Sequence, residues 1–258
     1  MSKKEQGLLL SASADGSVTY WDVISGKSLS SIKGLSESDI YSLDLSKSGT
    51  QIAIGGKDFN VRVFDFDTKS LRMVLEPGNS IKLGHTNRVY SVKFTDDPHI
   101  LVSGGYDNTI FIWDLRTSKS IGYIFGPHIR GDSIDVRQDT MLTGGFDKEG
   151  ILQLWSIGDK KLLRDIIWNP EPHDDSSGYV YTARFEKDHN NRYVVASGRI
   201  DIDKNEIRIF ANKDEYKLIG RIGLNKTAVS LDFMNTKQCF AVGSGDGFVY
   251  SFNYGEKE

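Results

Sequence analysis

Residues 103–119 read SGGYDNTIFIWDLRTSK, and this stretch decides how the rest of the chain is interpreted. A glycine-rich turn leads into an alternating segment that ends in Trp113-Asp114, and a charged turn follows. Alternation with a period of two is typical of a half-buried β-strand. The stretch is either a site for chemistry or one copy of a structural unit.

The stretch recurs along the chain. Its six copies are SASADGSVTYWDV (11–23), IGGKDFNVRVFDF (54–66), SGGYDNTIFIWDL (103–115), TGGFDKEGILQLWSI (143–157), SGRIDIDKNEIRIFAN (197–212) and VGSGDGFVYSFNY (242–254). The aromatic residues that close them, at positions 21, 64, 113, 155, 210 and 252, are 43, 49, 42, 55 and 42 residues apart. Such a period indicates a repetitive architecture, so the stretch is a structural unit.

Each copy predicts four short strands. In the third copy they are VYSVKF (89–94), ILVSGG (100–105), TIFIWDL (109–115) and SIGYIFG (120–126). Turn residues separate such runs throughout, and no segment carries a convincing helical period. The sequence therefore predicts an all-β fold.

A period near 43, with four strands per copy and Trp-Asp at the third strand, resembles the WD40-repeat family of β-propellers. The likeness is specific because Gly84-His85, Asp107 and Trp113-Asp114 recur in register with the family pattern. It covers nearly the whole chain and implies a WD40 β-propeller of six recognisable repeats.

The two ends of the repeat array are incomplete. The first copy lacks its first strand and the sixth lacks its fourth, so 22 strands are expected rather than 24. We expect one domain over residues 8–254, with short tails at 1–7 and 255–258. Three explanations are open: an N-terminally shortened version of a seven-bladed protein, a six-bladed ring with an imperfect seam, or strands donated by a partner. We favour the first.

The resemblance also implies a hydrogen-bonded network in a blade. Family members often join a His before the first strand, a Ser or Thr on the second, an Asp in the turn and a Trp on the third. The third copy supplies His85, Ser103, Asp107 and Trp113, and the fourth supplies His128, Thr143, Asp147 and Trp155. Buried polar groups are costly unless paired, so mutual pairing would hold the strands in register.

The other copies depart from this pattern. The fifth copy keeps Ser197 and Asp201 but closes with Phe210. Only the turn aspartate recurs in all six copies, at Asp15, Asp58, Asp107, Asp147, Asp201 and Asp246. The degenerate blades are expected to rely more on apolar packing.

Composition argues against several kinds of partner. A formal net charge of −3 gives no electrostatic reason to expect nucleic acid or an anionic membrane. The N-terminal run of three leucines is too short for a signal-peptide core, and no stretch approaches the roughly 20 apolar residues of a membrane-spanning helix. The lone Cys239 suits a reducing compartment. We expect an intracellular protein, cytoplasmic or nuclear.

No motif indicates a cofactor, a metal or a small-molecule substrate. GSGDGF (243–248) looks like a nucleotide-binding loop, but a strand follows where a helix is needed. DIDKNE (201–206) starts like a calcium loop but lacks the required glycine and closing glutamate. The recurring His/Ser/Asp grouping is scaffold rather than a hydrolase triad, since no G-x-S-x-G turn accompanies it. We expect no enzymatic activity.

Partners of this family often contact the face bearing the loops that enter each first strand and that link the second and third strands. Carried across in register, that face comprises Asp39, Tyr41, Lys57, Arg88, Tyr90, Tyr106, Arg130, Asp132, Phe146, Tyr179, Tyr181, Ile200, Thr227, Val229 and Gly245. Tyrosine, phenylalanine and arginine are enriched at interface hot spots. We expect the face to bind a protein or peptide, which makes the chain a scaffold in a larger assembly. The alternative is that these aromatics only pack into blade edges.

WDLR (113–116) has a second implication at the level of the family. WD40 proteins that serve as substrate receptors of cullin ubiquitin ligases often carry W-D-x-R and dock to the adaptor through the arginine. Arg116 is thus a possible docking residue, although arginine is also common in such exposed turns.

Overall fold

A computed structural model of the chain describes residues 7–33, 38–79, 82–147, 150–168, 178–187, 192–201, 204–235 and 237–254, without the side chains of residues 200, 201 and 214. The expected tails at 1–7 and 255–258 lie outside this part of the chain, except for Gly7. Apart from one 3-10 helix, η1 (Asn212–Asp214), the regular elements described are strands. The all-β prediction is confirmed.

The strands form six antiparallel sheets, or blades, that follow one another along the chain. Blades 1 and 2 consist of β1 (Leu8–Ala12), β2 (Val18–Asp22) and β3 (Ser28–Ile32), then β4 (Ile40–Leu45), β5 (Gln51–Gly56), β6 (Val61–Asp65) and β7 (Leu71–Leu75). Blades 3 and 4 consist of β8 (Val89–Phe94), β9 (Ile100–Gly105), β10 (Thr109–Asp114) and β11 (Lys119–Phe125), then β12 (Ile134–Arg137), β13 (Thr140–Gly144), β14 (Leu152–Ser156) and β15 (Lys161–Asp165). Blades 5 and 6 consist of β16 (Tyr179–Phe185), β17 (Tyr193–Asp201), β18 (Lys204–Ala211) and β19 (Lys217–Leu224), then β20 (Ala228–Phe233), β21 (Cys239–Ser244) and β22 (Val249–Asn253).

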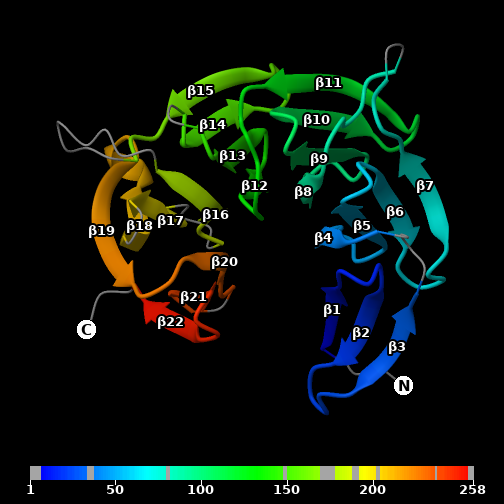
Figure 1. Cartoon of the computed structure of the whole chain (residues 1–258), viewed down its shortest axis with the longest axis horizontal. Coiled ribbons are helices and arrows are strands. Elements are labelled where there is room, and N and C mark those ends of the chain that lie inside the picture. Colours follow the sequence, from blue (N-terminus) through cyan, green and yellow to red (C-terminus); the bar gives the residue numbers. More distant parts are fainter. Residues whose placement is uncertain are drawn as a thin grey trace.

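The blades are arranged as a β-propeller around a common centre (Figure 1). The first strands β4, β8, β12, β16 and β20 face the centre, and β7, β11, β15 and β19 form the rim. Blades 1 and 6 have three strands each in the described residues, and they stand at the two ends of an open arc. The prediction of six blades, the first without its inner strand and the last without its outer strand, is confirmed.

The hydrophobic core consists of layers between successive blades. The layer between blades 2 and 3, for example, joins Val63 of β6 to Val92 of β8 and to Trp113 of β10, all of them buried. Similar clusters lie between blades 1 and 2, 3 and 4, 4 and 5, and 5 and 6. None of the clusters found among the described residues joins blade 6 to blade 1.

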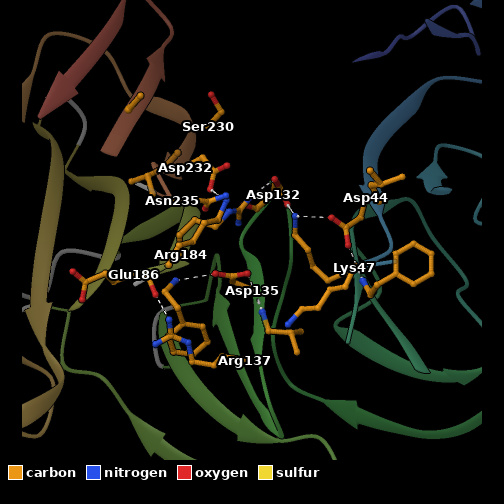
Figure 2. Close-up of a pocket in the computed structure, with 18 of the residues that line it drawn as sticks. Asp44, Lys47, Asp132, Asp135, Arg137, Arg184, Glu186, Ser230, Asp232 and Asn235 are labelled. Atoms are coloured by element: carbon orange, nitrogen blue, oxygen red, sulfur yellow. Dashed lines mark hydrogen bonds and ion pairs between the residues drawn. The ribbon is translucent and has the colours of Figure 1, made fainter. Parts of the chain in front are cut away.

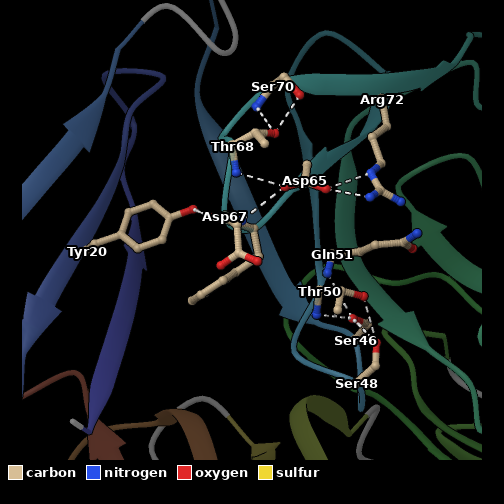
Figure 3. A network of polar contacts seen from close by, with 11 residues as sticks. Tyr20, Ser46, Ser48, Thr50, Gln51, Asp65, Asp67, Thr68, Ser70 and Arg72 are labelled. Carbon is tan, nitrogen blue, oxygen red and sulfur yellow. Dashed lines mark hydrogen bonds and ion pairs between the residues drawn. The ribbon is translucent and has the colours of Figure 1, made fainter. Parts of the chain in front are cut away.

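The aspartate that follows the third-strand aromatic caps the turn into the fourth strand, as Asp65 illustrates (Figure 3). Its carboxylate accepts the backbone N–H groups of Thr68 at 2.8 Å and Asp67 at 3.1 Å. It also accepts the Nε–H of Arg72 at 3.1 Å. The Thr68 N–H, together with the Arg72 guanidinium, holds the pKa of Asp65 at about 2. The Asp of Trp-Asp therefore fixes a turn.

Candidate functional site: a loop face of aromatic and arginine side chains

The four residues expected to form a network in blade 3 lie together. His85 Nε2 is 2.8 Å from Ser103 Oγ, and its Nδ1 is 2.9 Å from Asp107 Oδ2. Trp113 Nε1–H donates to Ser103 Oγ at 2.7 Å. Because His85 and Ser103 are fully buried, each of these contacts pairs a group that would otherwise be costly. The arrangement ties the loop before β8 to β9 and β10, which is a structural role.

The corresponding residues of blade 4 form only part of such a network. Trp155 Nε1–H donates to Thr143 Oγ1 at 3.1 Å, and the backbone N–H of His128 donates to Asp147 at 3.2 Å. The imidazole of His128, however, contacts the Asn108 side chain of blade 3. Burial lowers the pKa of His128, so the ring is neutral at pH 7. The expected link from His128 to Thr143 is thus replaced by a bridge between blades.

Three tyrosines of the expected loop face occupy the same position in their blades. Tyr41, Tyr90 and Tyr181 each lie at a register break, a β-bulge, near the start of β4, β8 and β16. A bulge leaves one residue out of the ladder and re-aims its side chain. This explains why the tyrosines gather on the face rather than inside the sheets.

The loops between second and third strands are hydrogen-bonded to the same place. The backbone N–H of Tyr106 donates to the carbonyl of Arg88 at 2.9 Å, and Lys57 N–H donates to Asp39 O at 2.9 Å. A Cβ at Gly105 would lie 2.3 Å from the Arg88 carbonyl oxygen, so glycine is required for this approach. The face is therefore built from two rigidly joined segments in each of these blades.

Between blades 2 and 3 the face carries a tyrosine pair, Tyr41 and Tyr90. Their rings stack with centroids 5.0 Å apart and planes 13° apart. Tyr41 O–H donates to Asp39 Oδ2 at 3.0 Å, and Lys57 Nζ lies 3.7 Å from the same oxygen. A hydrogen bond to Tyr90 raises the pKa of Arg88. Both rings are half-buried, so they are packed yet accessible.

Across blades 3 to 5 the face carries an arginine cluster, formed by Tyr106, Arg130, Phe146, Tyr179 and Tyr181. The guanidinium carbon of Arg130 lies 4.8 Å from the Tyr106 ring centroid and 5.2 Å from that of Phe146. Phe146 in turn stacks on Tyr179 at 5.1 Å and meets Tyr181 edge-on at 4.7 Å. The aromatic rings are half-buried and Arg130 is exposed.

At the three positions expected for this face, blade 6 carries Thr227, Val229 and Gly245, none of them aromatic. Val229 lies at the register break of β20 and is exposed, and Gly245 N–H donates to Thr227 O at 3.0 Å. The side chain of Ile200 in blade 5 lies outside the described residues.

The inner strands enclose a second feature, a cavity of about 1320 Å³ in the centre of the arc (Figure 2). A charged residue at the same position of each first strand lines it, and the sign alternates from blade to blade: Asp44, Lys93, Asp135, Arg184 and Asp232. The sequence analysis did not identify these residues. The available signal was their spacing, which in blades 2, 3, 5 and 6 is three residues after the bulge residue.

Two of these aspartates accept a backbone N–H from the neighbouring blade. Asp44 Oδ2 accepts the backbone N–H of Phe94 at 2.8 Å, and Asp135 Oδ2 accepts that of Phe185 at 2.8 Å. Asp232 has no further blade beside it in the described chain and accepts the N–H of the next residue in its own strand at 2.9 Å.

Asp132 does not lie on the aromatic surface as expected but points into the cavity (Figure 2). It forms an ion pair with the buried Arg184, lies 3.5 Å from Lys93 Nζ, and accepts the Ser91 hydroxyl at 3.1 Å. Burial opposes its ionisation, but the Arg184 and Lys93 cations hold the pKa of Asp132 at about 2. The two inward-facing cations of blades 3 and 5 explain this orientation.

The cavity and the face differ in how their charges are satisfied. Each charged side chain described in the cavity wall has a hydrogen-bond or ion-pair partner in the protein. On the face, Arg88 is bonded to Tyr90 and Arg130 to Tyr106 Oη at 3.2 Å, and among the described residues neither forms an ion pair. The unneutralised charge of this region is therefore on the face.

Arg116 of the WDLR stretch lies at the rim, in the turn from β10 to β11. Its Nε–H and NH2 groups donate to Asp114 at 3.0 and 2.8 Å, and the side chain remains 62% exposed. These bonds raise the pKa of Arg116 and hold that of Asp114 at about 2. Arg116 is therefore accessible to a partner, but its guanidinium is already hydrogen-bonded to Asp114.

Other kinds of site are not found in the part of the chain that the structure describes. No group of three or more His, Cys, Asp or Glu side chains there has the geometry to hold a metal ion. The helical content described is limited to η1, and no described helix is long and apolar enough to cross a bilayer.

Comparisons with known proteins agree with the repeat pattern. The family model for the WD domain, G-beta repeat, matches residues 26–65 and 78–114. Each match runs from the end of one blade to the third strand of the next and stops at the aspartate that caps the turn.

Curated relatives are similar over part of the chain. A U3 small nucleolar RNA-associated protein 21 homolog of Schizosaccharomyces pombe is 30% identical over 58% of this chain and 16% of the relative. A guanine nucleotide-binding protein subunit beta of Saccharomyces cerevisiae is 33% identical over 44% of this chain and 26% of its own length. The target of rapamycin complex subunit wat1 of S. pombe is 26% identical over 62% of this chain and 48% of its own length. The chain thus spans less than half the length of these relatives.

Repeat register, blade architecture and family matches agree. The chain carries WD40 repeats at residues 26–65 and 78–114, and its blades are arranged as a β-propeller.

Proposed function

We propose that this chain is a non-enzymatic scaffold that uses its loop face to recruit a protein or peptide into a multiprotein assembly inside the cell. The observation that carries the proposal is the arginine cluster, in which rings from blades 3 and 4 lie against one exposed cation and two tyrosines of blade 5 pack on one of those rings. Rigid aromatic and arginine side chains bind partners at a small entropic cost.

Two further points support the proposal. The charged side chains of the central cavity have partners within the protein, many of them in ion pairs with one another. The cavity therefore offers fewer unpaired charges to a ligand than the face does. Two relatives are named as subunits, one of a target of rapamycin complex and one of a guanine nucleotide-binding protein. An assembly role for this chain is consistent with those names.

Affinity capture from a lysate tests the proposal. The double variant Tyr90→Ala/Tyr106→Ala removes one ring from each aromatic group, and we expect it to lose partners that the wild type retains. A matched control, Tyr123→Ala/Phe125→Ala, removes two exposed rings from the rim strand β11 and should capture them normally. Retention of every partner by the loop-face variant, with its fold intact by circular dichroism, would reject the loop face.

A substrate receptor of a cullin-type ubiquitin ligase is the second candidate, because Arg116 in WDLR is accessible at the rim. Docking through this arginine would require its bonds to Asp114 to be exchanged for bonds to the adaptor. We expect Arg116→Ala to abolish adaptor binding if this function holds. Adaptor binding that is unchanged, or absent in the wild type, would reject it.

A further inference from the structure

We propose that the loop face selects acidic peptides and that Arg130 binds the peptide carboxylate. This inference rests on the proposed function and names the chemistry of the partner.

The position of Arg130 determines which kind of group can approach it. The Tyr106 and Phe146 rings lie close to its guanidinium carbon, at 4.8 and 5.2 Å from their centroids. One NH2 group already donates to Tyr106 Oη at 3.2 Å. A guanidinium carries five N–H donors and the Arg130 side chain is exposed, so donors remain to which a carboxylate can bind through two parallel hydrogen bonds.

The charge balance of the face favours an anion. In the described chain, seven arginines lie against a carboxylate: Arg62, Arg72, Arg116, Arg164, Arg184, Arg192 and Arg208. Arg130 and Arg88 form no such pair in the described chain, and the nearby Asp39 is occupied by Tyr41 and Lys57. An ordered cation without a counter-ion in the protein can gain a charge-assisted hydrogen bond on binding.

The positions of the two arginines also suggest how acidic residues are arranged along the peptide. Arg88 and Arg130 lie in the segments that lead into the first strands of the neighbouring blades 3 and 4. A peptide that crosses these blades can place one carboxylate on each arginine. Apolar residues beside them would pack on Phe146, Tyr179 and the tyrosine pair, whose rings are already held by stacking.

Peptide selection followed by direct binding tests the inference. A random linear-peptide library is panned on the wild-type chain, and fluorescein-labelled copies of the selected peptides are titrated by fluorescence anisotropy. We expect selected sequences to be enriched in Asp and Glu. Replacing their acidic residues by Asn and Gln should weaken binding by about tenfold or more, the loss expected of one charge-assisted hydrogen bond.

Variants of the protein complete the design. Arg130→Gln should weaken peptide binding by the same factor. Arg130→Lys keeps the charge but not the planar guanidinium, so it should weaken binding by an intermediate factor. Arg72→Gln is the matched control, since Arg72 lies on the rim strand β7 and pairs with Asp65. Thermal unfolding of each variant checks that the fold is kept.

The outcomes separate this inference from the proposed function. Peptides that lose binding to Tyr90→Ala/Tyr106→Ala but carry no acidic enrichment, or bind Arg130→Gln at full affinity, would overturn the acidic preference and leave the loop face intact. Peptides that bind only when phosphorylated would also overturn it. Selected peptides that bind the double variant at wild-type affinity would reject the loop face itself.

Discussion

Ser103 illustrates how one buried hydroxyl organises a blade. It accepts the indole N–H of Trp113 and contacts the imidazole of His85, and no part of its side chain is exposed. The equivalent Ser11 of blade 1 accepts only the indole N–H of Trp21, at 2.9 Å in an exposed setting. The same residue type at the same position should therefore contribute differently to stability.

We predict that Ser103→Ala lowers the free energy of unfolding by about 2–4 kcal/mol, because it leaves two buried polar groups without a partner. Ser11→Ala should cost less than about 1 kcal/mol, since water can replace its hydroxyl. Urea unfolding of both variants measures the difference. Equal costs would contradict the role given to the blade 3 network.

A pH-dependent prediction concerns Asp132. Its pKa is about 2 in the folded protein, against about 3.9 in an unfolded chain. A depressed pKa in the folded state means that the ion pair with Arg184 stabilises the fold above about pH 4 and is lost as the pH falls through about 2.

Asp132→Asn should therefore lower the unfolding free energy by about 1–2 kcal/mol at neutral pH, because the carboxylate is still partly solvated. The difference from wild type should shrink toward zero near pH 2. Urea titrations at several pH values test this expectation. A difference independent of pH would show that the lost charge is not the cause.

Some positions that the repeat pattern predicts for single residues differ in the structure. Ser197 was aligned with Ser103, but the pairing of Phe210 with Val194 places Ala196 in that position, and Ser197 donates to a backbone carbonyl instead. Asp132 is expected on the loop face but points into the cavity. One-residue register and side-chain direction depend on neighbouring strands and charges, which a linear pattern does not contain.

At the level of elements, the repeat plan translated closely into strands. The segments expected at 89–94 and 100–105 are β8 and β9, with the same bounds. Period-two alternation and turn residues are local signals, so they were readable without a structure. The β-bulges were not readable, because a bulge is defined by two strands at once.

The links between first strands allow a prediction at this scale. Asp135 accepts a backbone N–H from the neighbouring blade and one from its own strand, whereas the more exposed Asp232, in the same position, accepts one from its own strand and pairs with Lys187. We expect Asp135→Ala to cost about 1–2 kcal/mol of unfolding free energy and Asp232→Ala clearly less. Chemical denaturation of the pair gives the comparison, and a larger cost for Asp232→Ala would contradict the interblade role.

For the whole molecule, the count of blades and the two incomplete ends followed from the spacing of six aromatic residues. The alternation of acidic and basic side chains around the central cavity could not be predicted in this way, because it appears only when one residue from each of five blades is brought to a common centre. The loop face could be predicted in part. Its residues could be named from register, but the stacking of Tyr41 on Tyr90 and the enclosure of Arg130 required the relative placement of blades.

The open arc has a consequence for how the protein loses structure. In the described part of the chain, five apolar layers join the six blades, so these blades are expected to behave thermodynamically as a one-dimensional stack. Blades in the middle are held on two sides and the terminal blades on one. Amide protons of β1–β3 and β20–β22 should accordingly exchange with deuterium sooner than those of β8–β14, as the stack frays inward. Uniform exchange would indicate that all six blades open as one cooperative unit.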